Sequence, residues 1–98
     1  MYLAYSAKLL SFYPSDIDIT IPELPGWIAR KSAGRGIYTV THNLNVSDPN
    51  NILITGIALD PNITVSVANI ASNAFAITAK KNGEECIANF MFVLVVKK

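Results

Sequence analysis

Few side chains in this sequence could take part in chemistry, and their number limits the chemistry open to it. The chain has one histidine, His42, and one cysteine, Cys86, whereas a zinc site of the Cys/His type needs three or four such ligands. No Gly-x-Ser-x-Gly elbow accompanies His42, as it would in many Ser-His-Asp hydrolases. Glu84 and Glu85 precede Cys86, and acidic neighbours disfavour the thiolate that a nucleophile requires. We interpret Cys86 as structural. His42 is expected to hydrogen-bond the turn that follows it, the alternative being a binding contact.

The seven carboxylates do not form a recognisable catalytic pair. Asp16 and Asp18 would lie on one face of a strand, and Glu84 and Glu85 are neighbours in a turn. The paired carboxylates of a glycosidase must instead flank a bond across a cleft. We therefore interpret both pairs as solvated surface groups.

Two further patterns fall short of an ion or phosphate site. Asp48-Pro49-Asn50 and Asp60-Pro61-Asn62 supply too few oxygen ligands for a calcium loop. Ala33-Gly34-Arg35-Gly36 lacks the lysine and the following helix of a phosphate-binding loop. We expect no enzyme activity, no catalytic residues, no cofactor and no metal.

The composition indicates a small domain with more apolar surface than a monomer can easily cover. Hydrophobic residues make up 51% of the 98 residues and charged residues only 15%, against about 25% charged in an average soluble domain. Exposed apolar patches usually mark interfaces, so we expect subunits to cover one another. The net charge of +1 favours neither nucleic acid nor an anionic membrane. The uncharged apolar run 87–96 is too short to insert across a membrane as a helix.

Residues 1–35 are expected to form an irregular arm used for docking or oligomerisation. Ile17, Ile19 and Ile21 alternate with polar residues, which predicts a short half-buried strand limited by prolines on both sides. The first segment could form a short helix or extend, and that choice stays open. The arm's aromatic and isoleucine residues are the predicted interface: Tyr2, Tyr5, Phe12, Tyr13, Ile17, Ile19, Ile21 and Trp27.

Residues 36–98 are expected to form an all-β, small antiparallel β-sandwich or barrel-like module. Runs of strand-forming residues separated by turn residues predict strands over 36–42, 52–59, 63–68, 74–79 and 87–97. Asn82-Gly83 predicts a type I′ hairpin turn. The last strand is apolar on both faces, so it should be central in the sandwich or lie at a subunit contact. Alternation predicts a core of Tyr38, Val40, Ile54, Val65, Val67, Phe75, Ile77, Phe90, Phe92 and Leu94.

One stretch of this module carries a family resemblance. It is Gly36-Ile37-Tyr38-Thr39-Val40-Thr41-His42-Asn43-Leu44. Together with Phe75, Phe90 and Phe92 further along, it resembles the C-terminal β-module of phage tail fibres and related virion appendages, over roughly residues 26–98. Asn45 stands where that pattern usually has glycine, and asparagine tolerates the left-handed conformation. The resemblance implies structural roles for Gly36, Tyr38, Val40, Thr41, His42, Asn43, Leu44, Phe75, Phe90 and Phe92, and it implies trimers.

We therefore expect a virion structural protein made in the host cytoplasm, a fibre, tail-tip or decoration component that contributes to host attachment. Its partners would be further copies of itself, other virion proteins, and a host surface glycan or receptor. The alternative is a carbohydrate-binding receptor-recognition module. After residue 38 every aromatic falls in a predicted strand, which weakens a sugar-stacking site in the loops.

Overall fold

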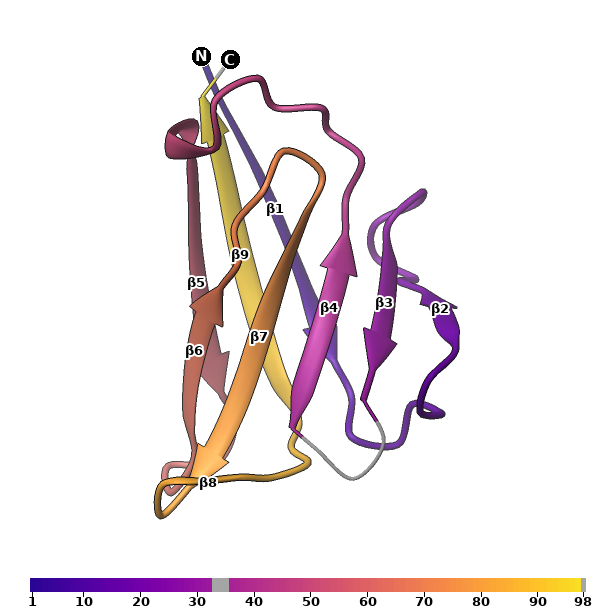
Figure 1. Cartoon of the computed structure of the whole chain (residues 1–98), viewed down its shortest axis with the longest axis vertical. Coiled ribbons are helices and arrows are strands. Elements are labelled where there is room, and N and C mark those ends of the chain that lie inside the picture. Colours follow the sequence, from indigo (N-terminus) through magenta and orange to yellow (C-terminus); the bar gives the residue numbers. More distant parts are fainter. Residues whose placement is uncertain (33–35, 98) are drawn as a thin grey trace.

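The computed structural model describes residues 1–32 and 36–97 and consists of β-strands arranged in two facing sheets (Figure 1). In chain order the elements are β1 (Tyr2–Leu9), β2 (Asp18–Thr20), β3 (Ile28–Lys31), β4 (Ile37–Thr41), the 3-10 turn η1 (Pro49–Asn51), β5 (Ile52–Ala58), β6 (Thr64–Ala68), β7 (Ala74–Lys81), β8 (Glu84–Glu85) and β9 (Phe90–Lys97).

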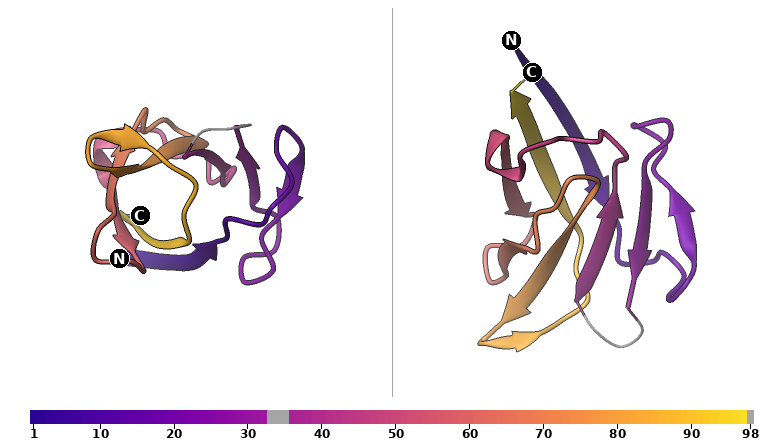
Figure 2. Two further views of the ribbon diagram at one scale, coloured as in Figure 1. Left: turned by 90° about the horizontal axis from the view of Figure 1, so that it is seen from below. Right: turned by 45° about the horizontal axis from the view of Figure 1, so that its top comes forward.

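Each sheet is antiparallel. The three-stranded sheet has the order β1-β9-β5, and the six-stranded sheet has the order β2-β3-β4-β7-β6, with β8 paired to β7. The two sheets enclose the core, and both ends of the described chain lie at one end of the molecule (Figures 1 and 2). The protein is thus an all-β sandwich, as the sequence predicts.

The five strands expected after residue 36 correspond to β4, β5, β6, β7 and β9. The last begins at Phe90 rather than at residue 87, because the preceding residues cross from one sheet to the other after β8. β9 is central in its sheet, as expected, and its inner face, with Phe90, Phe92 and Leu94, is buried in the core.

The expected irregular arm over 1–35 is wrong in most of its length. β1 pairs with β9 at eight successive positions, from Tyr2 opposite Lys97 to Leu9 opposite Phe90. β2 and β3 belong to the other sheet, and β3 pairs with β4 across the boundary expected after residue 35. Burial alternates along β1, as it does in a strand with one face on the core: Ala7 and Leu9 are buried, whereas Ser6 and Lys8 are exposed. The first 32 residues therefore contribute strands to both sheets.

The predicted hairpin turn is present. Asn82 and Gly83 have φ values of 53° and 81°, as a type I′ turn requires. Gly56 lies where β5 approaches β6 closely, because a Cβ at this position would overlap the Val65 side chain. The absence of a side chain at Gly56 thus allows the two sheets to meet at this corner.

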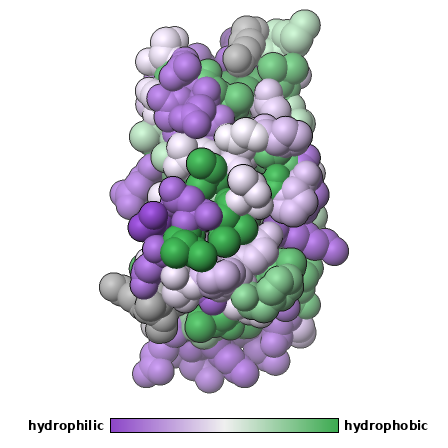
Figure 3. Space-filling model, turned by 90° about the vertical axis from the view of Figure 1, so that its right-hand side faces the viewer, coloured by the Kyte–Doolittle hydropathy of each residue, from purple (hydrophilic) through white to green (hydrophobic). Residues whose placement is uncertain are grey.

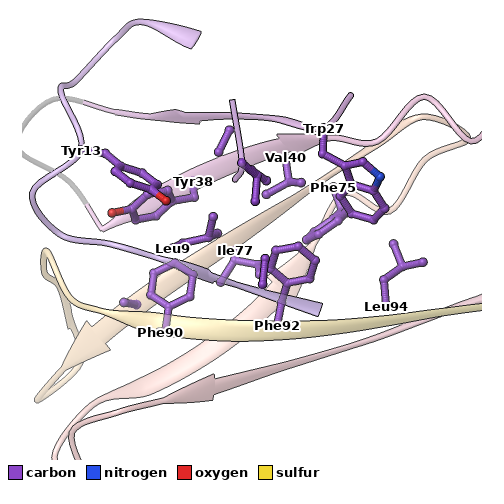
Figure 4. Packing of buried hydrophobic residues seen from close by; sticks show 14 of the residues in the cluster. Leu9, Tyr13, Trp27, Tyr38, Val40, Phe75, Ile77, Phe90, Phe92 and Leu94 are labelled. Carbon is purple, nitrogen blue, oxygen red and sulfur yellow. The ribbon is translucent and has the colours of Figure 1, made fainter. Parts of the chain in front are cut away.

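Aromatic side chains fill the middle of the sandwich (Figure 4). The rings of Tyr38 and Phe90 meet edge to face at 4.9 Å between centroids, and those of Phe75 and Phe92 meet at 5.3 Å. Seven of the ten predicted core residues are fully buried: Tyr38, Val40, Phe75, Ile77, Phe90, Phe92 and Leu94. The other three, Ile54, Val65 and Val67, are half-buried because they lie on the β5 and β6 edges of their sheets.

Candidate interaction surface

The His-Asn-Leu turn and the Ser72-Asn73 segment hold one another in place. The Asn73 carbonyl accepts hydrogen bonds from the backbone N–H of His42 at 2.8 Å and of Asn43 at 3.3 Å. The Asn73 side-chain oxygen accepts from the Asn45 N–H at 2.7 Å. Asn45 takes a positive φ of 52°, so the turn forms without the glycine usual in the resembling modules.

His42 is a buried, neutral part of this turn. Its Nδ1 accepts a hydrogen bond from the Leu44 N–H at 3.1 Å, as expected of a residue that holds the following turn. Because Nδ1 accepts, the proton of the neutral ring is on Nε2, which has no hydrogen-bond partner among the described residues. The ring lies between Trp27 and Phe75, with centroid distances of 5.5 and 6.2 Å. Burial lowers the pKa of His42, so the charged form is disfavoured.

Gly36 has a steric reason to be glycine. A Cβ at this position would overlap the carbonyl oxygen of Cys86 and would lie 2.7 Å from that of Ala79. The Gly36 carbonyl also accepts the Ala79 N–H at 2.8 Å, and Cys86 donates its N–H to the Ala79 carbonyl at 3.1 Å. Gly36 and Cys86 therefore serve the packing of the chain crossing after β7. Residues 33–35, the rest of the glycine-containing segment, lie outside the described residues.

A polar clamp joins the end of β1 to the six-stranded sheet. Tyr38 donates its hydroxyl to the Leu10 carbonyl, and Lys31, which lies opposite Tyr38, donates its ammonium to the Ser11 carbonyl at 2.8 Å. Burial, with a smaller contribution from Tyr13, raises the pKa of Tyr38 to about 12. Sequence reasoning missed Lys31 as a buried residue, since a lysine at the end of a short strand carries no signal of its distant carbonyl partner.

The predicted docking residues of the arm separate into two groups. Tyr13, Ile21 and Trp27 are buried in the chain's own core, so their prediction as docking side chains is wrong. They are covered because the segment between β1 and β3 packs back against the core, where Tyr13 meets Tyr38 and Trp27 meets Phe92. The remaining residues stay accessible: Tyr5 and Ile19 are half-buried, while Tyr2, Phe12 and Ile17 are 68%, 76% and 50% exposed. The side of the molecule that carries β2 and β3 mixes apolar and polar groups (Figure 3).

The outer face of the three-stranded sheet is the largely apolar surface that this fold leaves uncovered. We define it by three cross-strand rows, which are Ala4–Val95–Leu53, Ser6–Val93–Thr55 and Lys8–Met91–Ile57. Leu53 is 68% exposed and Ile57 45% exposed, and the β9 residues are half-buried only by their neighbours in the sheet. Sequence reasoning found the β9 part of this surface but missed Leu53 and Ile57. The signal was available, since β5 is also apolar on both faces.

The aspartates suspected of resembling calcium loops cap turns instead. Asp48 accepts the Asn50 N–H at 3.0 Å, and Asp60 accepts the Asn62 N–H at 2.8 Å. Across residues 1–32 and 36–97, no three acidic, histidine or cysteine side chains gather as metal ligands. Within the same residues, no helix has the length and apolar character to cross a membrane.

Shallow hollows lie near the end that carries the chain termini. One hollow of about 220 Å³ is lined by Leu44, Asn45, Val46 and Ser47 together with Asn51, Val96 and Lys97. A second is lined by Tyr2, Asn50, Asn51 and Lys97 among others. Ligand pockets usually enclose roughly 300–1,000 Å³, so the first is smaller than a typical small-molecule site.

Comparisons of the chain with protein-family models, with curated proteins and with solved structures found no match.

Proposed function

We propose that this chain is a non-enzymatic structural subunit of a phage virion, a fibre, tail-tip or decoration component that works as a homo-oligomer. The outer face of the three-stranded sheet is the observation that carries the proposal. It presents Leu53, Ile57, Met91, Val93 and Val95 on two adjacent strands. A monomer gains nothing from exposing these side chains, whereas a subunit buries them on assembly.

The virion assignment is supported by the sequence resemblance and by the positions of its motif residues. Gly36, His42 and Asn43 contribute to backbone packing and turn formation, as structural motif residues should. The resemblance favours a trimer, with other virion proteins as further partners. Host attachment through a glycan or receptor would be part of the same role.

A specific observation favours carbohydrate recognition as a second candidate function. Tyr2, 68% exposed, lines a hollow together with Asn50 and Asn51. An aromatic ring beside amide groups suits a sugar, which stacks its apolar face and hydrogen-bonds its hydroxyls. Tyr2→Ala should then abolish binding on a glycan array while Phe12→Ala, another exposed aromatic, leaves it unchanged. Equal binding by both variants would argue against this site.

The main proposal is tested on particles. Phage particles from the culture or prophage that encodes this chain should contain it as a stoichiometric protein in mass spectrometry, and antibodies to the chain should label one fixed place on the particle in electron microscopy. Purified particles that lack the chain would overturn the proposal.

A further inference from the structure

We propose that a second copy of this chain pairs antiparallel with the free edge of β1, through Tyr2, Ala4 and Ser6. The two three-stranded sheets would then form one continuous six-stranded sheet. The inference rests on the proposed function in that it names a contact through which the subunits assemble.

β1 has one unpaired edge. It pairs with β9 on one side, and no strand among residues 1–32 and 36–97 pairs with its other side. Natural edge strands are usually protected by prolines, bulges, charges or short length. β1 has eight residues, no proline, and one charged side chain, Lys8. Its N-terminal half extends toward the end of the molecule, away from β2 (Figure 2).

The direction of the free backbone groups follows from Lys8. Its N–H donates to Glu23 Oε2 at 3.0 Å, so it points away from β9. Both polar groups of a strand residue point to the same side, and this side alternates along the strand. The N–H and C=O groups of Tyr2, Ala4 and Ser6 therefore point to the free edge as well. The N–H of Lys8 is already bonded to Glu23.

These positions select one register. A two-fold axis beside Ala4 places it opposite Ala4 of the second copy, with Tyr2 opposite the second copy's Ser6. All three residues of each copy then exchange backbone hydrogen bonds. Shifting the register by two residues in one direction leaves Ser6 unpaired, and shifting it in the other requires Lys8 to release Glu23.

The same register extends the apolar outer face. The row Leu53–Val95–Ala4 of one copy meets the identical row of the other at the axis, which makes six apolar side chains in line. The lysine side chains of the paired strands stay apart. From strand spacing, Lys8 and the second copy's Lys97 would lie roughly 12 Å apart, which is beyond the Debye length of about 8 Å at physiological salt.

A strand-edge contact of this length is small beside a standard interface, so we expect concentration-dependent pairing rather than an obligate dimer. It is a two-fold contact and closes as a dimer. Combined with the three-fold contact that the resemblance favours, it would give a hexamer.

Introducing a charge at the axis tests the contact. Association of the full chain is measured by sedimentation equilibrium at up to about 100 μM. Ala4→Lys places two lysines opposite one another, with about 5.5 Å between their Cα atoms. Ala4→Glu places two glutamates there. We expect the dissociation constant to weaken at least tenfold in each variant alone. An equimolar mixture of the two should associate again. Ser66→Lys, at an exposed position on β6 of the opposite sheet, is the matched control and should associate as the wild type does.

Disulfide trapping tests the register directly. In a Cys86→Ala background, Ala4→Cys should give a covalent dimer on mild oxidation, because about 5.5 Å between Cα atoms suits a disulfide. Ser66→Cys, on the opposite sheet, should stay uncrosslinked. Circular dichroism and thermal unfolding confirm that each variant folds.

Association by Ala4→Lys equal to that of the wild type would overturn the pairing, as would a monomeric wild type throughout this concentration range. Neither result touches the virion assignment, which fails only if particles lack the chain. A stable trimer that is indifferent to charge at Ala4 would likewise overturn the β1 contact and leave the proposed function standing.

Discussion

At the scale of single residues, burial and hydrogen bonding together select a protonation state at His42. The ring is 3% exposed, its Nδ1 accepts the Leu44 N–H, and two aromatic rings flank it. A proton on Nδ1 would replace this hydrogen bond by two opposed N–H groups. The folded state therefore holds His42 neutral, with its pKa lowered chiefly by burial.

This lowering predicts a dependence of stability on pH. Below the ordinary histidine pKa of about 6.5, His42 is protonated in the unfolded chain but stays neutral in the folded chain until the lower folded pKa is reached. The His42 contribution to the free energy of unfolding is therefore complete above about pH 6.5 and is lost as pH falls toward the folded pKa. Urea unfolding at pH 7 and pH 5 should show this fall. His42→Asn, which retains a side-chain acceptor but does not titrate, should show a smaller one, and equal slopes in the two proteins would contradict the assignment.

Phe92 should be a major stabilising residue. It is fully buried, and its ring contacts those of Trp27 at 5.9 Å and Phe75 at 5.3 Å. Phe92→Ala should cost roughly 3–5 kcal/mol in the free energy of unfolding, measured by urea titration. The neighbouring Met91→Ala, on the outer face of the same strand, is the control and should cost distinctly less. A loss below about 1 kcal/mol for Phe92→Ala would show that the wrong face was assigned to the core.

At the scale of elements, β1 depends on contacts far away in sequence. It is paired with β9 along its whole length, and its end is held by Tyr38 and Lys31 from the other sheet. A docking arm over residues 1–35, as expected from the sequence, could lose residues 1–25 without unfolding the strands after residue 36. The structure argues otherwise, because that deletion removes Leu9, Tyr13 and Ile21 from the core.

Deleting residues 1–9 should therefore abolish cooperative unfolding. The deletion leaves β9 without one neighbour and opens the core at Phe90 and Phe92. Amide NMR spectra and thermal unfolding measure the effect. The Ala4→Lys variant, which keeps the strand and adds only one charge, should remain cooperative. A deletion variant with dispersed amide signals and a sharp transition would mean that the rest of the sandwich folds without β1.

At the scale of the whole molecule, the composition predicts surplus apolar surface, and the fold shows where it lies. With 51% hydrophobic and 15% charged residues, the chain fills its core and still leaves Leu53 and Ile57 exposed on the outer face. Assembly covers such surface, which is why we place the subunit contacts on the three-stranded sheet.

A charge on this face should weaken assembly without unfolding the protein. Leu53→Asp places a carboxylate among apolar neighbours, so the amount of chain incorporated into particles, or the mass of the soluble oligomer, should fall. Ser66→Asp, at an exposed position on β6 of the opposite sheet, is the matched control. The unfolding temperatures of both variants should stay near that of the wild type. Unchanged incorporation by Leu53→Asp would remove the outer face from the assembly.

The sequence by itself determined the strands after residue 36, the Asn82-Gly83 turn, and most of the core. These are local properties, because alternation and turn chemistry act over a few residues. It also predicted a central or interfacial position for β9 and a structural role for His42. The tertiary structure decided what depends on pairing between distant residues. The register of Tyr2 with Lys97 made the first segment a strand, and packing of the segment between β1 and β3 against the core buried Tyr13, Ile21 and Trp27. Which edge and which face remain uncovered follows from strand order, and strand order depends on contacts that a linear pattern does not contain.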